Sequence, residues 1–189
     1  SYPTNYEGPI LDWPIYDRVK ETADEISEIR ANYAALVTMV DEYFGRLLDY
    51  FDEYNLWEDT AIIVTTDHGF LLGEHDWWAK LRMPIYNEIA HIPLMVYHPE
   101  FASQAGSRRS ALTQTIDIMP TILDMFNLAP PKDVIGKSLL QILNCDHKLR
   151  DSLIFGYFGA SCNVTDGEHT YFCYPESMTA DGLFEYTLM

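Results

Sequence analysis

The sequence has few basic residues, with 12 Lys and Arg against 29 Asp and Glu, which gives a formal charge of −17. A chain this negative repels DNA, RNA and anionic membrane surfaces, so we expect neither nucleic acid nor a membrane as a partner. The same field repels an anionic substrate. Any activity on such a substrate therefore requires a local cation or lysine, or basic residues elsewhere in a longer protein.

Cysteine is scarce, and long apolar runs are missing. Cys145, Cys162 and Cys173 lack metal-ligand spacing and are odd in number, so we expect buried or free thiols and no disulfide framework. No run approaches the ~18 apolar residues of a membrane span, and residues 1–4 lack the features of a signal peptide. At 48% hydrophobic, the 189 residues can nevertheless form one sizeable core.

The first half of the chain alternates between helical and strand patterns. Apolar residues recur every three or four positions from Val19 to Phe51, which predicts an amphipathic helix with a break near residues 29–31. Residues 60–66 and 92–97 are apolar, β-branched runs. Such runs are typical of strands buried on both faces in a largely parallel sheet.

The second half predicts shorter elements. Asp117 can cap a helix that reaches Phe126, and residues 138–143 and 153–155 predict a short helix and a strand. Asp166-Gly167 lies between β-prone stretches and predicts a hairpin. We therefore expect an α/β fold: part of a mostly parallel central sheet flanked by helices over residues 1–143, then the start of a small antiparallel sheet over residues 144–189.

The most notable polar group is Asp67-His68-Gly69, which follows the first predicted strand. Ligands of open α/β sheets gather at the carboxyl ends of strands, and an Asp oxygen beside a His nitrogen suits a divalent cation. Gly69 would let the backbone turn sharply after them. On these three residues alone, a helix or turn cap beside a surface histidine is the more frequent explanation, because Asp-His-Gly is a short pattern, so the surrounding sequence decides.

The surrounding sequence closely resembles the C-terminal metal-site signature of the sulfatases, within the alkaline phosphatase superfamily. The resemblance includes an apolar strand, Asp-His-Gly, Gly73-Glu74-His75, a Trp-rich loop, Lys80, and the Ile92-Pro93-Leu94 strand. Further family motifs follow in order at residues 45–49, 56–60, 116–123 and 135–139, so the likeness covers roughly residues 26–174. The loop is most similar to those of iduronate-type and related glycan sulfatases.

The resemblance implies roles for four residues. Asp67 and His68 match two ligands of a divalent cation, which is usually Ca²⁺ in sulfatases. Lys80, thirteen positions after Asp67, matches the catalytic lysine that contacts the sulfate. His75 either contacts the substrate or holds the Trp77-Trp78 loop in place. A cation and an ammonium would together stabilise the negative charge of sulfuryl transfer.

The family's nucleophile is missing from the chain. Sulfatases carry a Cys/Ser-x-Pro-x-Arg motif that is converted to formylglycine, and the near matches at Ser1 and Cys173 both lack the arginine. The two N-terminal aspartates of the family's metal site are also absent. We therefore interpret the chain as a sulfuric ester hydrolase fragment that is inactive alone. The missing N-terminal part would carry the formylglycine, and the substrate would be a sulfated small molecule or glycan.

Other interpretations remain open. A phosphonate monoester hydrolase or phosphodiesterase of the same superfamily shares the Asp-His-Gly to Lys layout, and a non-catalytic module would have lost the nucleophile. Two-zinc phosphatases need a further histidine that this loop does not clearly provide. The resemblance favours an extracytoplasmic location, whereas the oligomeric state is not indicated. The Asn163-Val164-Thr165 sequon lies in a predicted strand, which disfavours glycosylation.

Overall fold

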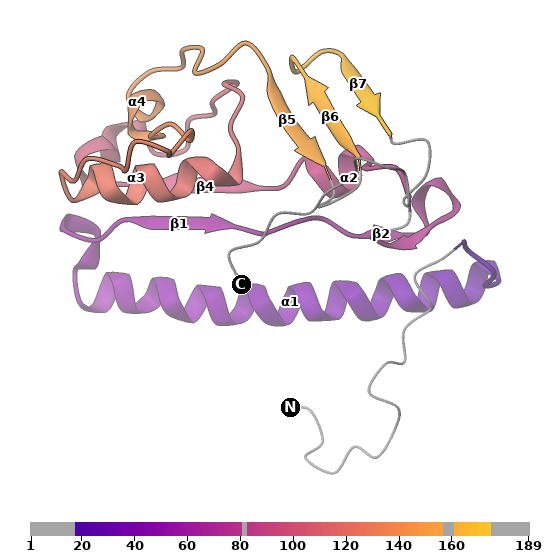
Figure 1. The fold of residues 1–189 in the computed structure, drawn as a ribbon. Coiled ribbons are helices and arrows are strands. Elements are labelled where there is room, and N and C mark those ends of the chain that lie inside the picture. The colour runs from indigo at the N-terminus through magenta and orange to yellow at the C-terminus, as the bar shows by residue number, and fades with distance from the viewer. Residues whose placement is uncertain (1–17, 81–82, 157–160, 175–189) are drawn as a thin grey trace. The chain divides into compact units, whose positions relative to one another are not determined.

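The computed structural model describes residues 18–80, 83–156 and 161–174, and the chain forms two compact units (Figure 1). The first unit combines Ser1–Asp49 with His68–Ile92, and the second combines Tyr50–Asp67 with Pro93–Met189. The predicted boundary at residues 143/144 is a separate division of the chain, and it stays a prediction. None of the described helices has the length and apolar character needed to cross a membrane.

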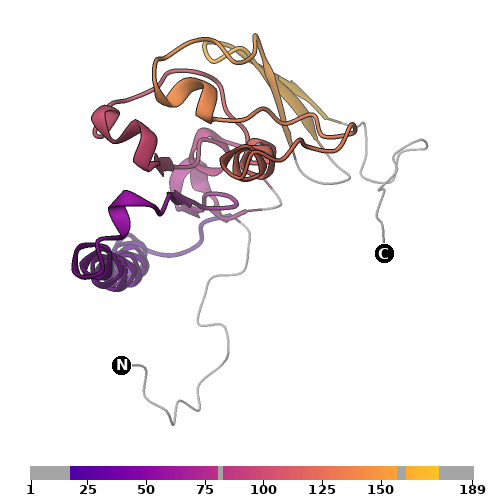
Figure 2. The ribbon, with the colours of Figure 1, turned by 90° about the vertical axis from the view of Figure 1, so that its left-hand side faces the viewer.

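The long helix α1, Ala23–Glu53, is continuous, and the break predicted near residues 29–31 is absent. Figure 1 shows the helix from the side, and Figure 2 shows it nearly end-on as a single straight coil. Its start is fixed by a capping box: Glu25 accepts the Thr22 backbone N–H at 2.8 Å, and Thr22 Oγ1 accepts the Glu25 N–H at 3.4 Å. This reciprocal cap satisfies backbone donors that the first turn leaves without partners.

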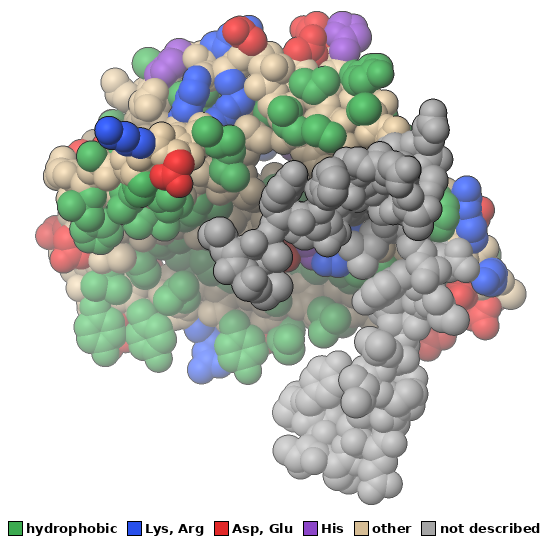
Figure 3. Space-filling model, in the orientation of Figure 1, with side chains coloured by type: hydrophobic (Ala, Val, Ile, Leu, Met, Phe, Trp, Pro, Cys, Tyr) green, Lys and Arg blue, Asp and Glu red, His purple; other side chains and the backbone are tan. Residues whose placement is uncertain are grey.

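The apolar side of α1 is mostly exposed, and Phe51 is its only buried residue. Figure 3 shows hydrophobic side chains gathered along this helix. The exposed apolar residues are Leu36, Val37, Met39, Val40, Tyr43, Leu47 and Tyr50. A contiguous apolar surface of this kind usually marks a contact with further polypeptide.

The first unit also contains a small hairpin and a short helix. Strand β2, Leu71–Leu72, pairs antiparallel with β3, Trp78–Ala79, and the 3-10 helix η2, Glu74–Asp76, connects them. Helix α2, Asn87–Ala90, follows. The buried residues of this part of the chain are Leu71, Trp78, Ala79, Met83, Ile85 and Ile89.

In the second unit, β1, Ile62–Thr65, pairs with β4, Leu94–Tyr97, and the two strands run antiparallel. Both strands were predicted, but we expected them in a mostly parallel sheet, and all strand pairs of the described residues are antiparallel. The reason is that an apolar run indicates that both faces of a strand are buried, whereas the connection between two strands determines whether they run parallel or antiparallel. A parallel neighbour needs a long crossover, usually helical. Among the residues that the structure describes between β1 and β4, the only α-helix is the four-residue α2.

The remaining helices of the second unit are short. They are η1, Leu56–Glu58; η3, Pro99–Gln104; η4, Thr115–Asp117; α3, Ile118–Met125; and α4, Leu140–Leu143. Leu139, Ile142 and Leu149 form a buried cluster. The predicted helix after Asp117 is confirmed as α3, but the predicted cap is wrong, because the Asp117 side chain does not cap α3. Asp117 is the last residue of η4, and its carboxylate accepts the Gln114 N–H in a capping box.

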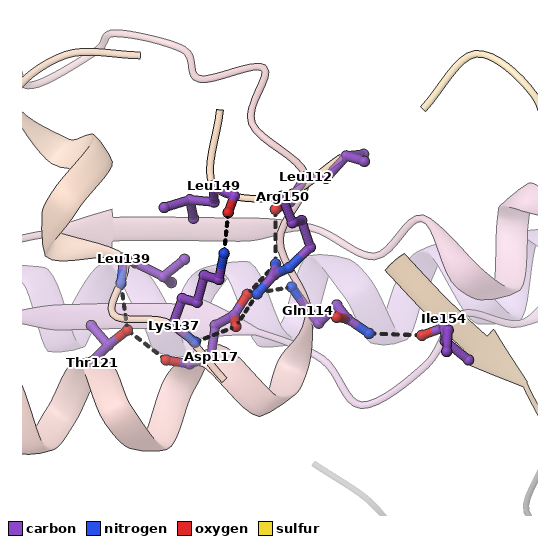
Figure 4. Close-up of polar contacts among 9 residues, drawn as sticks. All are labelled: Leu112, Gln114, Asp117, Thr121, Lys137, Leu139, Leu149, Arg150 and Ile154. Carbon is purple, nitrogen blue, oxygen red and sulfur yellow. Dashed lines mark hydrogen bonds and ion pairs between the residues drawn. The ribbon is translucent and has the colours of Figure 1, made fainter. Parts of the chain in front are cut away.

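Asp117 has a larger role than the predicted cap, because it is completely buried and bonded on every side. Arg150 donates to both of its carboxylate oxygens at 2.7 and 2.6 Å, and the backbone N–H groups of Gln114 and Lys137 donate at 2.7 and 2.8 Å (Figure 4). A buried carboxylate is stable only when it is paired and hydrogen-bonded in this way. The pair thus ties the start of α3 to two later segments.

The C-terminal sheet has the order β5-β6-β7, with β5 at Leu153–Gly156, β6 at Cys162–Thr165 and β7 at Thr170–Cys173. Both pairs are antiparallel, so the predicted small antiparallel sheet and its hairpin are confirmed. Gly167 takes the left-handed conformation in the turn, with φ of 96°. Asp166 Oδ1 accepts the N–H groups of Glu168 and His169 at 2.9 and 2.7 Å.

Two smaller sequence predictions can also be compared with the structure. Asn163 is completely buried in β6, so its sequon is not presented as a glycosylation acceptor. All three cysteines are free and exposed, which excludes the buried alternative.

Candidate active site

The site begins where β1 ends. Thr65, the last residue of β1, fixes the strand end, because its hydroxyl donates to the Pro93 carbonyl at 2.9 Å. Asp67 follows two residues later in the second unit, and its side chain is exposed. Its Oδ1 accepts the Thr66 hydroxyl at 3.4 Å.

His68 is half-buried, and both of its ring nitrogens have partners. Nδ1 lies 2.9 Å from the Gly69 carbonyl oxygen, and Nε2 contacts the Lys80 ammonium. A carbonyl oxygen only accepts hydrogen bonds, so we assign the proton to Nδ1. Nε2 then carries the lone pair of the ring, and this is the atom that the Lys80 ammonium contacts.

Gly69 serves a close approach instead of the sharp turn that the sequence suggested. Its φ is not positive, but a Cβ added to it would lie 1.7 Å from the Glu88 carbonyl oxygen. Its N–H donates to the Ile89 carbonyl at 2.9 Å. Only glycine allows the residues after His68 to pack this tightly against α2.

The segment between His68 and Lys80 has an unusual backbone. Gly73, His75, Asp76 and Ala79 all have positive φ, at 96°, 55°, 63° and 68°. Such conformations are costly for residues other than glycine and persist only where neighbouring contacts enforce them. The backbone conformation of the segment that leads to Lys80 is therefore closely constrained.

His75 supplies one of the enforcing contacts. Its Nε2 lies 3.1 Å from both carboxylate oxygens of Glu88, and its ring stacks on Tyr86 with centroids 3.8 Å apart and planes inclined by 8°. These contacts correspond to the loop-holding alternative of the sequence interpretation. Tyr86 and Glu88 could not be selected from the sequence, because no spacing rule links them to His75.

Trp78 supplies another contact, and its side chain is completely buried. The Trp78 indole N–H donates to Glu21 at 2.6 Å. A hydrogen bond from the Lys20 backbone, and then the one from Trp78, lower the pKa of Glu21 from its ordinary value of 4.5. Trp77 is half-buried, with the Arg18 guanidinium 4.1 Å from its ring centroid.

Beyond these residues, Arg30 of α1 anchors the loop by donating to the Leu72 carbonyl at 2.7 Å. The other described histidines have contacts of their own or are exposed. His98 accepts the Glu100 N–H at 3.3 Å, His169 lies 3.5 Å from Asp166, and His91 and His147 are exposed.

The structure therefore brings two of the four predicted site residues into contact, His68 and Lys80. In the described parts of the chain, no three His, Cys, Asp or Glu side chains gather into a metal-holding group. Asp67 and His68 have donor atoms of the kind that a divalent cation accepts, but calcium takes six to eight oxygens. Further ligands would have to come from outside the described residues.

Comparison with known proteins identifies the class. The family model described as Sulfatase matches residues 4–128, well over half of the 189 positions. The chain belongs to the sulfatase family.

Three known proteins illustrate the relationship. An N-acetylglucosamine-6-O-sulfatase of Bacteroides thetaiotaomicron is 40% identical over 117 residues, which cover 62% of this chain. The structure of BT4656 in complex with its substrate D-glucosamine-2-N,6-O-disulfate matches 72% of this chain with a TM-score of 0.62 and 31% identity. Phosphonate monoester hydrolase SpPMH from Silicibacter pomeroyi matches 82% with a TM-score of 0.70 and 28% identity. The fold is thus an α/β fold like that of these neighbours.

The chain spans only part of each of these proteins. The matched region is 20% of the N-acetylglucosamine-6-O-sulfatase, 29% of the BT4656 chain and 34% of the SpPMH chain.

Proposed function

We propose that this chain is the part of a sulfatase that supplies Asp67 and His68 to a divalent cation, which is Ca²⁺ by family resemblance, and Lys80 to the sulfate. The complete enzyme would hydrolyse sulfate esters, with a formylglycine nucleophile in an N-terminal part. One observation carries the proposal: the Lys80 ammonium meets the Nε2 atom of His68, a predicted metal ligand, although twelve positions separate the two residues.

The charge arrangement fits this chemistry. Cleavage of a sulfate ester shifts negative charge onto the sulfate oxygens and the leaving oxygen, and fixed positive groups at those oxygens stabilise the transition state. The loop contacts of His75 and Trp78 hold the backbone around Lys80, so its ammonium need not be reoriented during the reaction.

The donor set fits half of a metal site. The Gly69 carbonyl fixes the proton of His68 on Nδ1, so Nε2 carries the lone pair, and a cation would take the place of the Lys80 ammonium that now contacts it. Asp67 would add a carboxylate oxygen. A bound cation would polarise the sulfate oxygens. Two side chains cannot complete a calcium site, so we expect weak metal binding and no turnover by the 189-residue chain alone.

The exposed apolar side of α1 supports the same conclusion. Seven large apolar residues of α1 are exposed to solvent. Such a surface is energetically unfavourable unless further polypeptide covers it. In the complete enzyme, we propose that the β1-β4 pair joins a larger, mostly parallel sheet and that this helix flanks that sheet. An antiparallel pair at the edge of such a sheet is common.

For the substrate class, we favour a sulfated glycan. The name N-acetylglucosamine-6-O-sulfatase indicates a sulfated amino sugar as substrate, and the substrate of BT4656, D-glucosamine-2-N,6-O-disulfate, is also a sulfated amino sugar. Both proteins are at least 31% identical to this chain in the matched regions. We also propose an extracytoplasmic location, which the family resemblance favours.

A second candidate activity is phosphonate monoester hydrolysis, because SpPMH matches the largest share of the chain among these three proteins. A tetrahedral phosphonate ester would present similar oxygens to the same cation and lysine. The third interpretation is a non-catalytic module that has lost the nucleophile. An intact Cys/Ser-x-Pro-x-Arg motif upstream in the same reading frame would eliminate it.

The test compares hydrolysis of an aryl sulfate and an aryl phosphonate monoester by the complete protein, with the 189-residue chain as control. We expect faster turnover of the sulfate by the complete protein and none by the chain alone. Preference for the phosphonate would select the second candidate. Robust turnover by the 189-residue chain would overturn the proposal that the nucleophile lies elsewhere.

A further inference from the structure

Two of the three cysteines lie opposite each other on neighbouring strands. In the register of the C-terminal hairpin, Cys162 of β6 pairs with Cys173 of β7. Figure 1 shows these two strands side by side. The cysteines are eleven positions apart in the sequence, and only the turn at Asp166–His169 brings them to the same place.

The register provides the backbone geometry of a disulfide. Residues directly opposite in an antiparallel pair have Cα atoms about 4.5–5.5 Å apart. Disulfide-bonded cysteines usually have Cα separations of about 4.4–6.8 Å. Side chains of such partners leave the sheet on the same face, so the two sulfur atoms need only rotamer changes and a small local approach to meet.

The surroundings leave this position open. Both cysteines are exposed, and the β5 residue paired with Cys162 is Gly156, which has no side chain. Val164 and Tyr171, the next pair on the same face, are 37% and 68% exposed. A small oxidant can therefore reach both thiols in the described structure.

A disulfide at this position would stabilise strand β7 in the sheet. Within the described residues it pairs only with β6, and all four of its residues are exposed. Backbone hydrogen bonds on one side and a few aromatic contacts, such as that of Phe155 with Phe172, hold it in the sheet. Edge strands with so little burial exchange and open easily.

We propose that Cys162 and Cys173 form a cross-strand disulfide by exchange with a small-molecule disulfide such as oxidised glutathione. One cysteine thiolate attacks the glutathione disulfide, releasing one glutathione thiol and forming a mixed disulfide. The second cysteine thiolate then attacks the protein sulfur of that mixed disulfide and releases the second glutathione thiol. Glutathione disulfide is reduced, the protein dithiol is oxidised, and the two cysteine protons go to solvent or to the released thiolates.

Cys145 is the competitor for either cysteine. It follows α4, outside the three-stranded sheet, and is also exposed. The proposal gives Cys173 a specific partner and leaves Cys145 as a free thiol. It also implies an oxidising compartment, where such bonds persist.

The test uses the reduced 189-residue chain, equilibrated with mixtures of oxidised and reduced glutathione and mapped by mass spectrometry of unreduced peptides. We expect one internal cross-link, between Cys162 and Cys173, and the same product from a Cys145→Ser variant. In urea, where only chain proximity operates, the preference for this pair over the Cys145 pairs should shrink. Hydrogen exchange of the Thr170–Cys173 amides should be slower in the oxidised chain than in the reduced one.

Three results would overturn the proposal. They are stable glutathione adducts on Cys162 and Cys173 without a cross-link, a dominant cross-link to Cys145, or the same pair preference in native buffer and in urea. None of these results depends on sulfatase activity.

Discussion

The Lys80 ammonium contacts Nε2 of His68, while the Gly69 carbonyl oxygen lies 2.9 Å from the other nitrogen of the same ring. The imidazole is thus fixed between the backbone of its own motif and a lysine from the far end of the loop. This relationship links the residue predicted to bind the cation to the residue predicted to contact the sulfate.

The Gly69→Ala substitution should strongly destabilise the first unit. The new Cβ would lie 1.7 Å from the Glu88 carbonyl oxygen, which is backbone and cannot rotate away, so α2 would have to move. We expect a loss of stability of about 1–3 kcal/mol in urea unfolding, as for other overpacked sites.

The matched control is Gly45→Ala in α1, where a Cβ meets nothing within 4 Å. Alanine is the better helix former, so this variant should gain about 0.5–1 kcal/mol. Equal effects of the two substitutions would contradict the close packing at Gly69.

The Asp117→Asn substitution should cost about 3–5 kcal/mol, because it leaves Arg150 with a buried charge and no counter-ion. Thermal or urea unfolding of the second unit measures the loss. The Lys148–Asp151 pair is the control, since both of its side chains are mostly exposed, and Asp151→Asn should change stability little. A stable Asp117→Asn protein would show that the pair is not needed to hold α3.

The His75→Ala substitution should loosen the loop that carries Lys80, because it removes both the Glu88 contact and the Tyr86 stack. Acetylation of individual lysines, followed by mass spectrometry, measures this loosening. We expect Lys80 to react several times faster in the variant, with Lys148 unchanged as an internal reference.

The control for that experiment is His169→Ala, which removes a histidine–carboxylate pair of the same type in the C-terminal hairpin. It should leave the reactivity of Lys80 as it is. If the two variants behave alike at Lys80, the contacts of His75 do not position the loop.

The Glu21–Trp78 contact should make the first unit sensitive to acid. Hydrogen bonds from the Lys20 backbone and the Trp78 indole lower the folded-state pKa of Glu21 below its usual 4.5. The carboxylate therefore contributes its stability above about pH 4.5, and this contribution is lost as the pH falls through the lower, folded-state pKa. Unfolding measured from neutral to acid pH should show this loss in the native chain, and Glu21→Gln should remove that part of the pH dependence.

Much of the local structure was predictable, because its causes are local. Residues a few positions apart determine the periodicity of α1, the apolar strands before Asp67 and at residues 94–97, the helix after Asp117 and the Asp166-Gly167 turn. The family resemblance also selected Asp67, His68 and Lys80 before any geometry was known.

The parts that sequence reasoning missed depend on contacts between distant residues. Strand direction at β1 and β4 follows from the connection and not from the apolar pattern. The partners of His75 and Asp117 come from segments with no fixed spacing to them, and Cys162 meets Cys173 only through the hairpin register. Counting three cysteines suggested free thiols because spacing alone carries no information on register.

The most direct test of the central claim is the turnover number of the complete sulfatase for an aryl sulfate after Lys80→Ala substitution. Loss of a fixed positive group at the sulfate oxygens should lower kcat by roughly 10²–10³-fold. Lys148→Ala, which removes a mostly exposed lysine, should keep the native rate. A Lys80→Ala enzyme that turns over at the native rate would contradict the account.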